Sequence, residues 1–304
     1  MKILIAEDDT TTRLIFGATL RKMGHTVTAV EDGGKAWKAW QQEEYSLLIS
    51  DWIMPDIDGL ELCKRIRAQP SLQYTYIILL TSMDGKGSYL EGMDAGADDF
   101  ITKPFDEEQL AARLRVAERI IALHQKLHIQ ATHDHLTGVW NRAAIMGHLR
   151  GEVERARRQS SHMGVIIADL DYFKRINDTY GHPTGDEILQ EAARRMSAAL
   201  RGYDRIGRYG GEEFLITASG CDWSEAMALG ERICSSISSA PVNSRAGQID
   251  MTVSIGIATS CGQADDTGEL IAAADQALYQ AKEAGRNRVE LSRLATESRR
   301  RTWR

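Results

Sequence analysis

Cysteine is scarce in this 304-residue sequence, and the four that occur are Cys63, Cys221, Cys234 and Cys261. No two of them stand in a Cys-x-x-Cys pair, so the pattern is neither that of a disulfide framework nor that of a zinc site. Long apolar runs are missing as well, and the start turns acidic at Glu7, too early for a signal peptide. We therefore expect free thiols, a cytoplasmic location and no membrane partner.

Positive charge is not in excess in either part of the chain. The formal net charge is −6; residues 1–105 hold 11 Lys and Arg against 16 Asp and Glu, and the remainder holds 26 against 27. The basic run Arg299-Arg300-Arg301 is most simply a solvated end. This balance argues against a nucleic-acid partner, and the length suits two domains that each have a core.

Short apolar runs alternate with helical patterns in the first third of the chain, and a helix is expected over 13–23. Alternation of this kind predicts an α/β domain with a doubly wound, five-stranded parallel sheet. The five predicted strands are 3–6, 26–30, 47–50, 77–80 and 100–102.

Chemically active side chains follow most of these strands. Sites in such sheets lie beyond the carboxyl ends of the strands, so one crevice should collect them. Closely packed acids need a cation such as Mg²⁺, and a carboxylate beside it can attack a phosphoryl group whose oxygens a lysine and a hydroxyl hold. The side chains are Glu7, Asp8, Asp51, Thr81 and Lys103.

The alternative is that strand ends simply meet acidic loops. It accounts for Asp56 and Asp58, but poorly for the segments Asp51-Trp-Ile-Met-Pro55 and Lys103-Pro104. With these segments, residues 1–120 resemble a response-regulator receiver domain, which has a flavodoxin-like fold.

The receiver resemblance implies roles for individual residues. Asp51 would accept a phosphoryl group from a sensor histidine kinase, and the peptide before Pro104 would be cis. Glu7 stands where the family more often has Asp, which still suits a metal. The implied metal ligands are Glu7, Asp8, Asp51 and Ile53, and the implied switch residues are Thr81, Phe100 and Lys103.

Residues 106–132 contain no glycine or proline and are rich in helix formers, which predicts one long helix. Four apolar residues at alternating steps of four and three could form a seam with a second copy in a parallel dimer. The alternative, that the first turns pack on the receiver sheet, has equal weight for Leu110 and Leu114. The seam residues are Val116, Ile120, Leu123 and Leu127.

The second half centres on Arg208-Tyr-Gly-Gly-Glu-Glu-Phe214. Apolar segments around the Gly-Gly pair predict a β-hairpin whose turn needs positive φ at both central residues. Because strand side chains alternate between faces, Glu212 and Glu213 should face apart. A strand over 164–168 stops at Asp169; if it neighbours the hairpin, Asp169 and Glu212 form a carboxylate pair for Mg²⁺.

Two further motifs precede the hairpin: Asp134-His-Leu-Thr-Gly-Val-Trp-Asn-Arg142 and Asp169-Leu-Asp-Tyr-Phe-Lys-Arg-Ile-Asn-Asp-Thr-Tyr-Gly-His-Pro-Thr-Gly-Asp186. A lone Gly-Gly-Glu-Glu would more often be a solvated hairpin tip, but three ordered motifs in one segment are not expected by chance. Residues 134–290 resemble a GGDEF domain of the diguanylate cyclase family, in its Gly-Gly-Glu-Glu-Phe variant.

This resemblance implies an α+β, palm-like domain with a mainly antiparallel sheet. The implied reaction joins two GTP molecules into cyclic di-GMP and releases pyrophosphate twice. Mg²⁺, or Mn²⁺ in its place, would offset the charge that builds on phosphate oxygens. Since one domain holds one GTP, two must face each other, and a homodimer through the linking helix and the receiver is expected.

The resemblance also assigns residues in the second half. Asp169, the Leu170 carbonyl and Glu212 would hold the metal. Glu213 would be structural or a proton acceptor, and the residues do not decide between the two. The implied catalytic residues are Asp169, Glu212, Glu213 and Lys174. Asn177 and Asp186 would read the guanine edge, Lys174, Lys282 and Arg286 would hold phosphates, and the full substrate-binding set is Phe173, Lys174, Asn177, Asp186, Gly210, Gly211, Lys282 and Arg286.

An Arg-x-x-Asp pattern, Arg201 to Asp204, precedes Gly210, with five residues between Asp204 and Gly210. In the resembled family this pattern binds cyclic di-GMP and inhibits, and Arg232 stands where a neighbouring domain often adds an arginine. The alternative is a helix-end arginine paired with a nearby acid.

We expect a receiver over 1–120, a linking helix over 106–133 that continues its last helix, a cyclase domain over 134–290 and a tail over 291–304. One rival is a GGDEF domain that only senses cyclic di-GMP or GTP. Another is a response regulator that acts through protein contact or DNA. No metal or phosphate residue is lost from the motifs, and no basic excess favours DNA.

Overall fold

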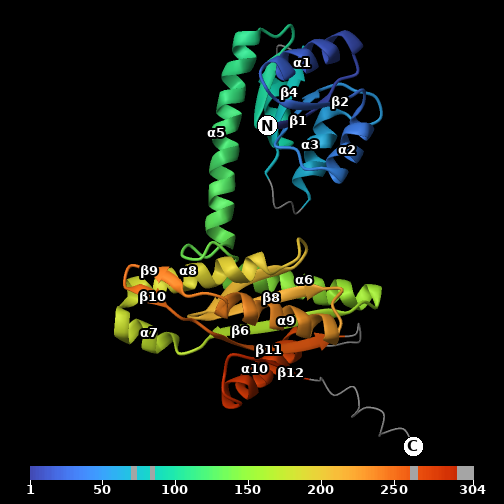
Figure 1. Ribbon diagram of the computed structural model, residues 1–304. Helices are drawn as coiled ribbons and strands as arrows, with labels where there is room; N and C mark the ends of the chain where they lie inside the picture. Colours follow the sequence, from blue (N-terminus) through green and yellow to red (C-terminus); the bar gives the residue numbers. More distant parts are fainter. Residues whose placement is uncertain (70–73, 83–85, 261–265, 293–304) are drawn as a thin grey trace, which may run out of the picture. The chain divides into compact units, whose positions relative to one another are not determined.

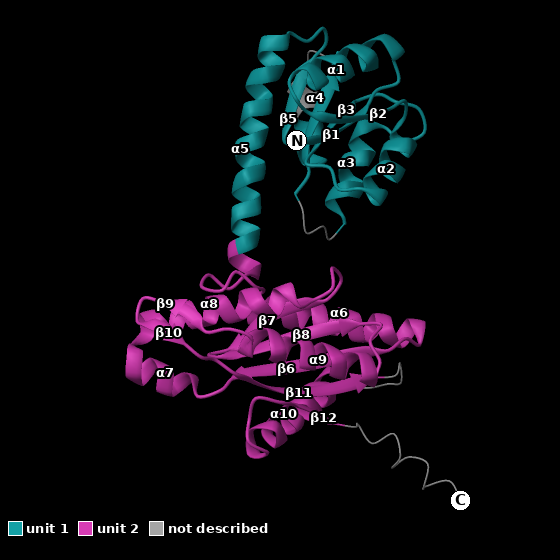
Figure 2. Cartoon of the chain, viewed as in Figure 1, with its two compact units in different colours: residues 1–129 teal, residues 130–304 magenta. Residues whose placement is uncertain are grey.

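The computed structural model describes residues 1–69, 74–82, 86–260 and 266–292. It divides into two compact units, Met1–Ile129 and Gln130–Arg304, which Figure 2 colours separately. Each unit has its own sheet and helices, most of which are labelled in Figure 1. The expected tail beyond residue 292 and Cys261 lie outside the described residues.

The first unit is built on a parallel five-stranded sheet in the order β2-β1-β3-β4-β5, which confirms the predicted doubly wound α/β fold. The strands are β1 Lys2–Ala6, β2 Thr26–Val30, β3 Leu47–Asp51, β4 Tyr76–Thr81 and β5 Asp99–Thr102. The helices are α1 Thr10–Lys22, α2 Gly33–Gln42, α3 Gly59–Arg67, α4 Lys86–Asp94 and α5 Glu107–Thr132. The first helix begins three residues before the expected start because Asp9 caps it, accepting from the Thr12 N–H.

Both faces of this sheet are covered. All six residues of β4 are buried, and the first five alternate between two apolar clusters. Ile77 packs in the cluster that contains Leu62 of α3, whereas Ile78 packs in the one that contains Phe16 of α1. Helices on both faces leave the carboxyl edge of the sheet as the place for polar side chains.

The helix α5 packs on this sheet at its beginning. Leu110 and Leu114 are buried in the same cluster as Phe16, which confirms the sheet-packing interpretation for these two residues. Ile120 is partly buried against that cluster, so it is not a free seam position. Leu123 and Leu127 are 59% and 61% exposed.

The second unit has a five-stranded mixed sheet in the order β12-β11-β6-β8-β7, in which only the β11–β12 pair is parallel. The strands are β6 Met163–Leu170, β7 Arg205–Gly210, β8 Glu213–Ser219, β11 Val253–Ser260 and β12 Val289–Ser292, and β9 Val242–Ser244 pairs with β10 Gly247–Ile249. The helices are α6 Arg142–Gln159, α7 Phe173–Tyr180, α8 His182–Ala198, α9 Trp223–Ser238 and α10 Thr267–Glu283. The expected mainly antiparallel α+β architecture is confirmed.

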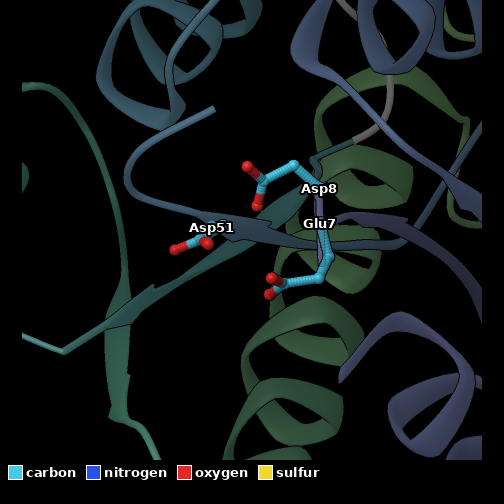
Figure 3. Close-up of side chains that lie close together, drawn as sticks. All are labelled: Glu7, Asp8 and Asp51. Carbon is cyan, nitrogen blue, oxygen red and sulfur yellow. The ribbon is translucent and has the colours of Figure 1, made fainter. Parts of the chain in front are cut away.

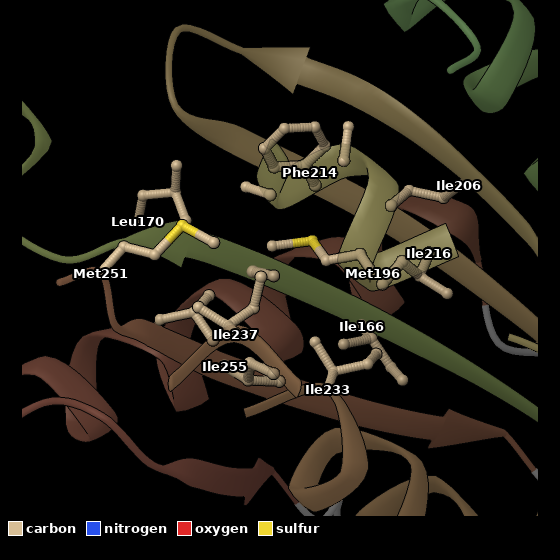
Figure 4. Close-up of a cluster of buried hydrophobic side chains, with 14 of the residues drawn as sticks. Ile166, Leu170, Met196, Ile206, Phe214, Ile216, Ile233, Ile237, Met251 and Ile255 are labelled. Atoms are coloured by element: carbon tan, nitrogen blue, oxygen red, sulfur yellow. The ribbon is translucent and has the colours of Figure 1, made fainter. Parts of the chain in front are cut away.

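Side-chain alternation along β6 divides the core of this unit in two. Ile166 packs with Met196 of α8 and Ile233 of α9, as Figure 4 shows. Ile167 packs in the opposite cluster, with residues of α6 and α10. Asp169 has the parity of Ile167, so it lies on the face that α10 covers.

Helix α10 approaches the sheet closely at Gly256 of β11. A Cβ at this position would stand 2.1 Å from the Ala274 carbonyl oxygen and 2.2 Å from the Leu278 nitrogen. Only glycine permits this contact, which brings the last turn of α10 beside the end of β6.

The predicted hairpin is present, but its turn lies one residue later than expected. Strand β7 ends at Gly210 and β8 begins at Glu213, so Gly211 and Glu212 form the turn. Neither Gly210 nor Gly211 has positive φ, which corrects the prediction. The pairing register shifts between Arg208 and Gly210, which marks a β-bulge in β7. A bulge increases the local twist of the strands. In a hairpin with a type I′ or II′ turn, that twist would come from the turn itself.

Candidate functional site

Three acids meet at the carboxyl edge of the first sheet. One carboxylate oxygen from each of Glu7, Asp8 and Asp51 lies within 4.8 Å of the others, and Figure 3 shows the three side chains together. Glu7 and Asp8 follow β1 directly, while Asp51 ends the neighbouring strand β3. The parallel topology alone brings these side chains together.

Lys103 joins this cluster from the end of β5. Its Nζ lies 2.7 Å from Asp51 Oδ2 and donates to Glu7 Oε1 at 2.9 Å. Burial alone would lower the pKa of Lys103, but the hydrogen bonds to Asp51 and Glu7 and the charges of these two acids together outweigh burial and raise it. The Lys103–Pro104 peptide is cis, which confirms that expectation.

Glu7 is fully buried in this cluster. Burial raises the pKa of its carboxyl, and the charge of Asp51 adds to that, while Lys103 works in the opposite direction. Within the described residues, Glu7 Oε2 has no hydrogen-bond partner, although Lys103 Nζ lies 2.7 Å away in an unsuitable direction. A buried acceptor of this kind beside two further acids suits a hard divalent cation.

The remaining receiver residues surround Asp51. Thr81 ends β4 and is 7% exposed. Phe100 of β5 is buried, and its ring centroid lies 6.1 Å from that of Trp52, the residue after Asp51. The side chain of Ile53 is exposed and has no donor atom, so the backbone carbonyl is the group of this residue that is suited to a metal.

In the second unit, Asp169 stands directly opposite Glu213 across the β6–β8 pair. The two side chains therefore share the face that α10 covers. Lys282 of α10 forms an ion pair with Asp169, with 2.9 Å between Nζ and Oδ2. Burial raises the pKa of Asp169, the charges of Glu212 and Asp171 raise it further, and Lys282 opposes them.

The parity argument for the two hairpin glutamates does not hold. Glu212 lies in the turn rather than in a strand, so alternation does not decide its direction, and Glu213 does not face away from Asp169. Burial raises the pKa of Glu213 most, and the charges of Asp169 and Asp275 raise it further. Glu212 is near enough to Asp169 to influence it electrostatically, and its carbonyl accepts from the Leu170 N–H at 3.4 Å.

The expected guanine residues lie on two neighbouring helices. Asn177 is on α7 and Asp186 is on α8, where it is exposed. Asn177 Oδ1 is buried and has no partner within the described residues, which leaves an acceptor for a donor on a ligand. Lys174 of α7 is exposed, whereas Phe173 packs its ring in the apolar core.

Arg286 follows α10 in a left-handed backbone conformation, with φ of 63°. Its guanidinium carbon lies 4.7 Å from the ring centroid of Tyr172. The Arg286 guanidinium therefore stacks beside the end of β6, while Lys282 pairs with Asp169 itself. The sequence analysis did not predict a role for Tyr172. Its position two residues before Lys174, a predicted phosphate-binding residue, could have indicated one.

The Arg-x-x-Asp residues form a compact turn between α8 and β7. Asp204 is 5% exposed and its Oδ2 accepts from the Arg201 N–H at 2.9 Å. The Arg201 side chain is exposed, with 3.7 Å between Nη2 and Glu225 Oε1, so it has the nearby acid that the alternative interpretation requires. Arg232 of α9 donates from Nε to the Ala199 carbonyl at 2.9 Å.

The sequence motifs contain one contact that sequence reasoning missed. Arg208 Nη1 lies 3.3 Å from both oxygens of Asp134, and its Nε donates to the Gly211 carbonyl at 2.9 Å. Asp134 also accepts from the Thr137 N–H and hydroxyl. The spacing Asp-x-x-Thr is a local turn signal, but the link to Arg208 is tertiary.

The chain belongs to the family of diguanylate cyclase GGDEF domains, whose family model matches residues 131–288. The family model of the response regulator receiver domain matches residues 3–115.

Among particular proteins, the chain is similar to the response regulator PleD of Caulobacter vibrioides, with 31% identity over 252 residues, which is 80% of this chain and 56% of PleD. It is 35% identical over 178 residues to the probable diguanylate cyclase DgcC of Escherichia coli, covering 59% of this chain and 48% of DgcC. The chain thus spans about half the length of the curated relatives it matches.

Among solved structures, the coiled coil and GGDEF domain of DgcB from Caulobacter crescentus in complex with c-di-GMP matches with a TM-score of 0.56 and 30% identity, over 61% of this chain and 98% of that one. The diguanylate cyclase SiaD of Pseudomonas aeruginosa, in complex with its activator SiaC, matches with a TM-score of 0.51 and 32% identity, over 60% of this chain and 72% of that one.

None of the helices in the described part of the chain combines the length and the apolar character that a bilayer crossing requires.

Proposed function

We propose that this chain is a diguanylate cyclase that condenses two GTP molecules into cyclic di-GMP and two pyrophosphates, under the control of phosphorylation at Asp51. The observation that carries the cyclase proposal is the group at the end of β6: Asp169 opposite Glu213, with Lys282 paired to Asp169 at 2.9 Å. Acids and a phosphate-binding cation lie together there, as phosphoryl-group transfer requires.

The acids of this group suit a divalent cation, Mg²⁺ or Mn²⁺. The charge of Glu212 acts on both Asp169 and Glu213, and burial makes the charged forms of Asp169 and Glu213 costly. Asp169, the Leu170 carbonyl and Glu212 would hold the ion, which when bound would offset charge on the phosphate oxygens.

The chain's own side chains would bind and orient GTP. Asn177 offers a buried acceptor to the guanine edge, with Asp186 beside it on α8. Lys174, Lys282 and Arg286 would hold the phosphates, with the backbone of Gly210, Gly211 and Phe173 lining the site. The position of Glu213 directly opposite Asp169 supports a role as proton acceptor rather than a purely structural one.

Two such units must meet, because each holds one GTP. Leu123 and Leu127 are exposed on α5 and four residues apart, which supports a homodimer through this helix and the receiver. We propose functional boundaries at 1–120 for the receiver, 106–133 for the linking helix and 134–290 for the cyclase domain.

Phosphorylation by a sensor histidine kinase would act on the receiver site and shift the dimer. The ion pairs of Lys103 with Asp51 and Glu7 must rearrange when Asp51 carries a phosphoryl group. If the phosphorylated wild type and Asp51→Asn have equal activity, this regulation is wrong.

Product inhibition would use the exposed guanidinium groups of Arg201 and Arg232, with Asp204 shaping the turn. The expected result for Arg201→Ala is activity that no longer falls as cyclic di-GMP accumulates.

The cyclase proposal is tested by incubating the purified chain with GTP and Mg²⁺ and separating the products by chromatography. Wild type should yield cyclic di-GMP, and Asp169→Asn should yield none. Binding of cyclic di-GMP or GTP without turnover in the wild type would favour the sensing-module rival instead.

A further inference from the structure

A buried carboxylate beside the site has no role in the proposed reaction. Asp171 lies one residue beyond β6 and is 5% exposed. Ser254 Oγ donates to its Oδ1 at 2.7 Å, while Thr252 Oγ1 at 2.7 Å and the Asn287 N–H at 3.1 Å donate to its Oδ2. Asp171 therefore ties the end of β6 to the start of β11 and to the loop between α10 and β12.

The loop between α10 and β12 has an unfavourable backbone conformation. Gly285, Arg286 and Asn287 have φ of 111°, 63° and 47°. Residues with a Cβ avoid this left-handed region, so two in succession persist only where the surroundings hold them. The Arg286 N–H is held by the Ala281 carbonyl at 3.0 Å, and the Asn287 N–H is held by Asp171.

The side chain of Arg286 leaves this loop toward Tyr172. Its Nη1 lies 3.5 Å from the Tyr172 hydroxyl, and its guanidinium covers the ring. Tyr172 is the residue after Asp171. The Asp171 carboxylate thus fixes Asn287, the residue after Arg286, while Tyr172, the residue after Asp171, provides the ring that the guanidinium covers.

We propose that Asp171 is a positioning residue for Arg286, which it holds in the conformation that presents the guanidinium to the GTP phosphates. The inference rests on the phosphate-binding role given to Arg286 in the proposed function. A preorganised side chain binds more tightly because less ordering is needed on binding. Loss of Asp171 should therefore weaken GTP binding more than it slows the chemical step.

A double-mutant cycle in the full chain tests this inference, with KM and kcat from product formation and Kd for GTP from calorimetry. Asp171→Ala should raise KM and Kd about tenfold, the effect of one charge-assisted hydrogen bond, and change kcat about twofold at most. In a chain that already carries Arg286→Ala, adding Asp171→Ala should change KM no further.

Ser254→Ala is the matched control, because Ser254 donates only to Oδ1 and leaves the link to Asn287 in place. Its KM should stay within about twofold of the wild type. Where the alanine variant does not fold, Asp171→Asn keeps the size of the side chain, and its effect must likewise disappear beside Arg286→Ala.

Two results would overturn the inference, and they differ in whether the phosphate-binding role of Arg286 is lost with it. An effect of Asp171→Ala that is just as large beside Arg286→Ala shows that Asp171 acts on something else, and leaves the cyclase proposal standing. An unchanged KM in Arg286→Ala alone removes both the inference and the role given to Arg286. Absence of product from a wild type that binds GTP removes the cyclase proposal, while the calorimetric cycle still decides on Asp171.

Discussion

Arg208 and Asp134 are 74 residues apart in the chain, yet Arg208 Nη1 lies 3.3 Å from both carboxylate oxygens of Asp134. The same guanidinium holds the Gly211 carbonyl through Nε. Asp134 follows the end of α5 by two residues. The turn that carries Glu212 is therefore fixed by the segment that comes directly after the long helix.

Arg208→Ala should reduce both stability and product formation. The Arg208 and Asp134 side chains are only 19% and 14% exposed. The variant leaves the Gly211 carbonyl without its guanidinium donor and leaves Asp134 with the Thr137 donors but no cation. We expect a loss of about 1–3 kcal/mol in the free energy of unfolding, measured by denaturant titration. Arg158→Ala, which removes an exposed pair with Glu154, should cost less than about 0.5 kcal/mol. Unchanged activity in Arg208→Ala would contradict a role in fixing the turn.

Glu213→Gln should stabilise the protein at neutral pH while abolishing product formation. The pKa of Glu213 is raised in the folded state, so the stability from its protonation is complete below the ordinary pKa of glutamate and is lost as pH rises through the folded-state pKa. Glutamine avoids that loss. Thermal unfolding in EDTA should give a higher Tm for the variant at neutral pH and a difference that shrinks in acid.

The exposed Glu154→Gln is the control for this pH series and should follow the wild type throughout. A variant Tm below that of the wild type at neutral pH would refute the assigned burial of Glu213.

Lys103→Gln should destabilise the first unit in the absence of divalent metal. The variant leaves Glu7, which is fully buried, and Asp51 without their cation. We expect a lower Tm in EDTA, and a larger rise in Tm on addition of Mg²⁺ than in the wild type, because the metal takes over the neutralising role. Lys64→Gln, on the exposed side of α3, should leave both values unchanged. An equal Mg²⁺ effect in all three proteins would argue against a metal site at Glu7, Asp8 and Asp51.

Leu127→Glu should shift the chain toward the monomer. Leu127 is 61% exposed on α5, and a charge in a helical seam opposes pairing with a second copy. Light scattering should give a lower average mass, and specific activity should fall most at low protein concentration. Lys126→Glu places the same charge beside the seam and should keep the wild-type mass.

Gly256→Ala should unfold or strongly destabilise the second unit. The added Cβ would stand 2.1 Å from the Ala274 carbonyl oxygen, so α10 must move away from β11. The expected loss is about 1–3 kcal/mol or more in the free energy of unfolding. Gly151→Ala is the control, because a Cβ at this position of α6 meets nothing within 4 Å. Alanine favours the helix, so this variant should raise the free energy of unfolding by about 1 kcal/mol. Equal stability of the two variants would contradict the close packing of α10.

The sheet of the first unit and the meeting of Glu7, Asp8 and Asp51 were predictable from the sequence, because parallel topology brings strand ends to one edge whatever the side-chain details. The direction of Glu213 was not. It depends on where the turn lies, and a bulge before Gly210 moved the turn by one residue. A shift of one residue in a strand reverses every face assignment.

The contacts of α10 and of the loop that follows it were likewise not predictable from the sequence. Lys282 reaches Asp169 only because the helix packs on Gly256, and Asp171 meets Asn287 across 116 residues of sequence. Such contacts produce no periodic pattern in the sequence, because the residues around one partner do not indicate which distant residue it contacts. Local patterns located the motifs, whereas tertiary packing decided which of their atoms meet.

The four apolar clusters of the described residues each fall within one unit, two inside Met1–Ile129 and two inside Gln130–Arg304. The first unit could therefore be replaced by another domain, joined to α5 near residue 129, without exposing the apolar core of the second unit. With the proposed dimer through α5, the heptad phase of that helix would have to be preserved across the junction.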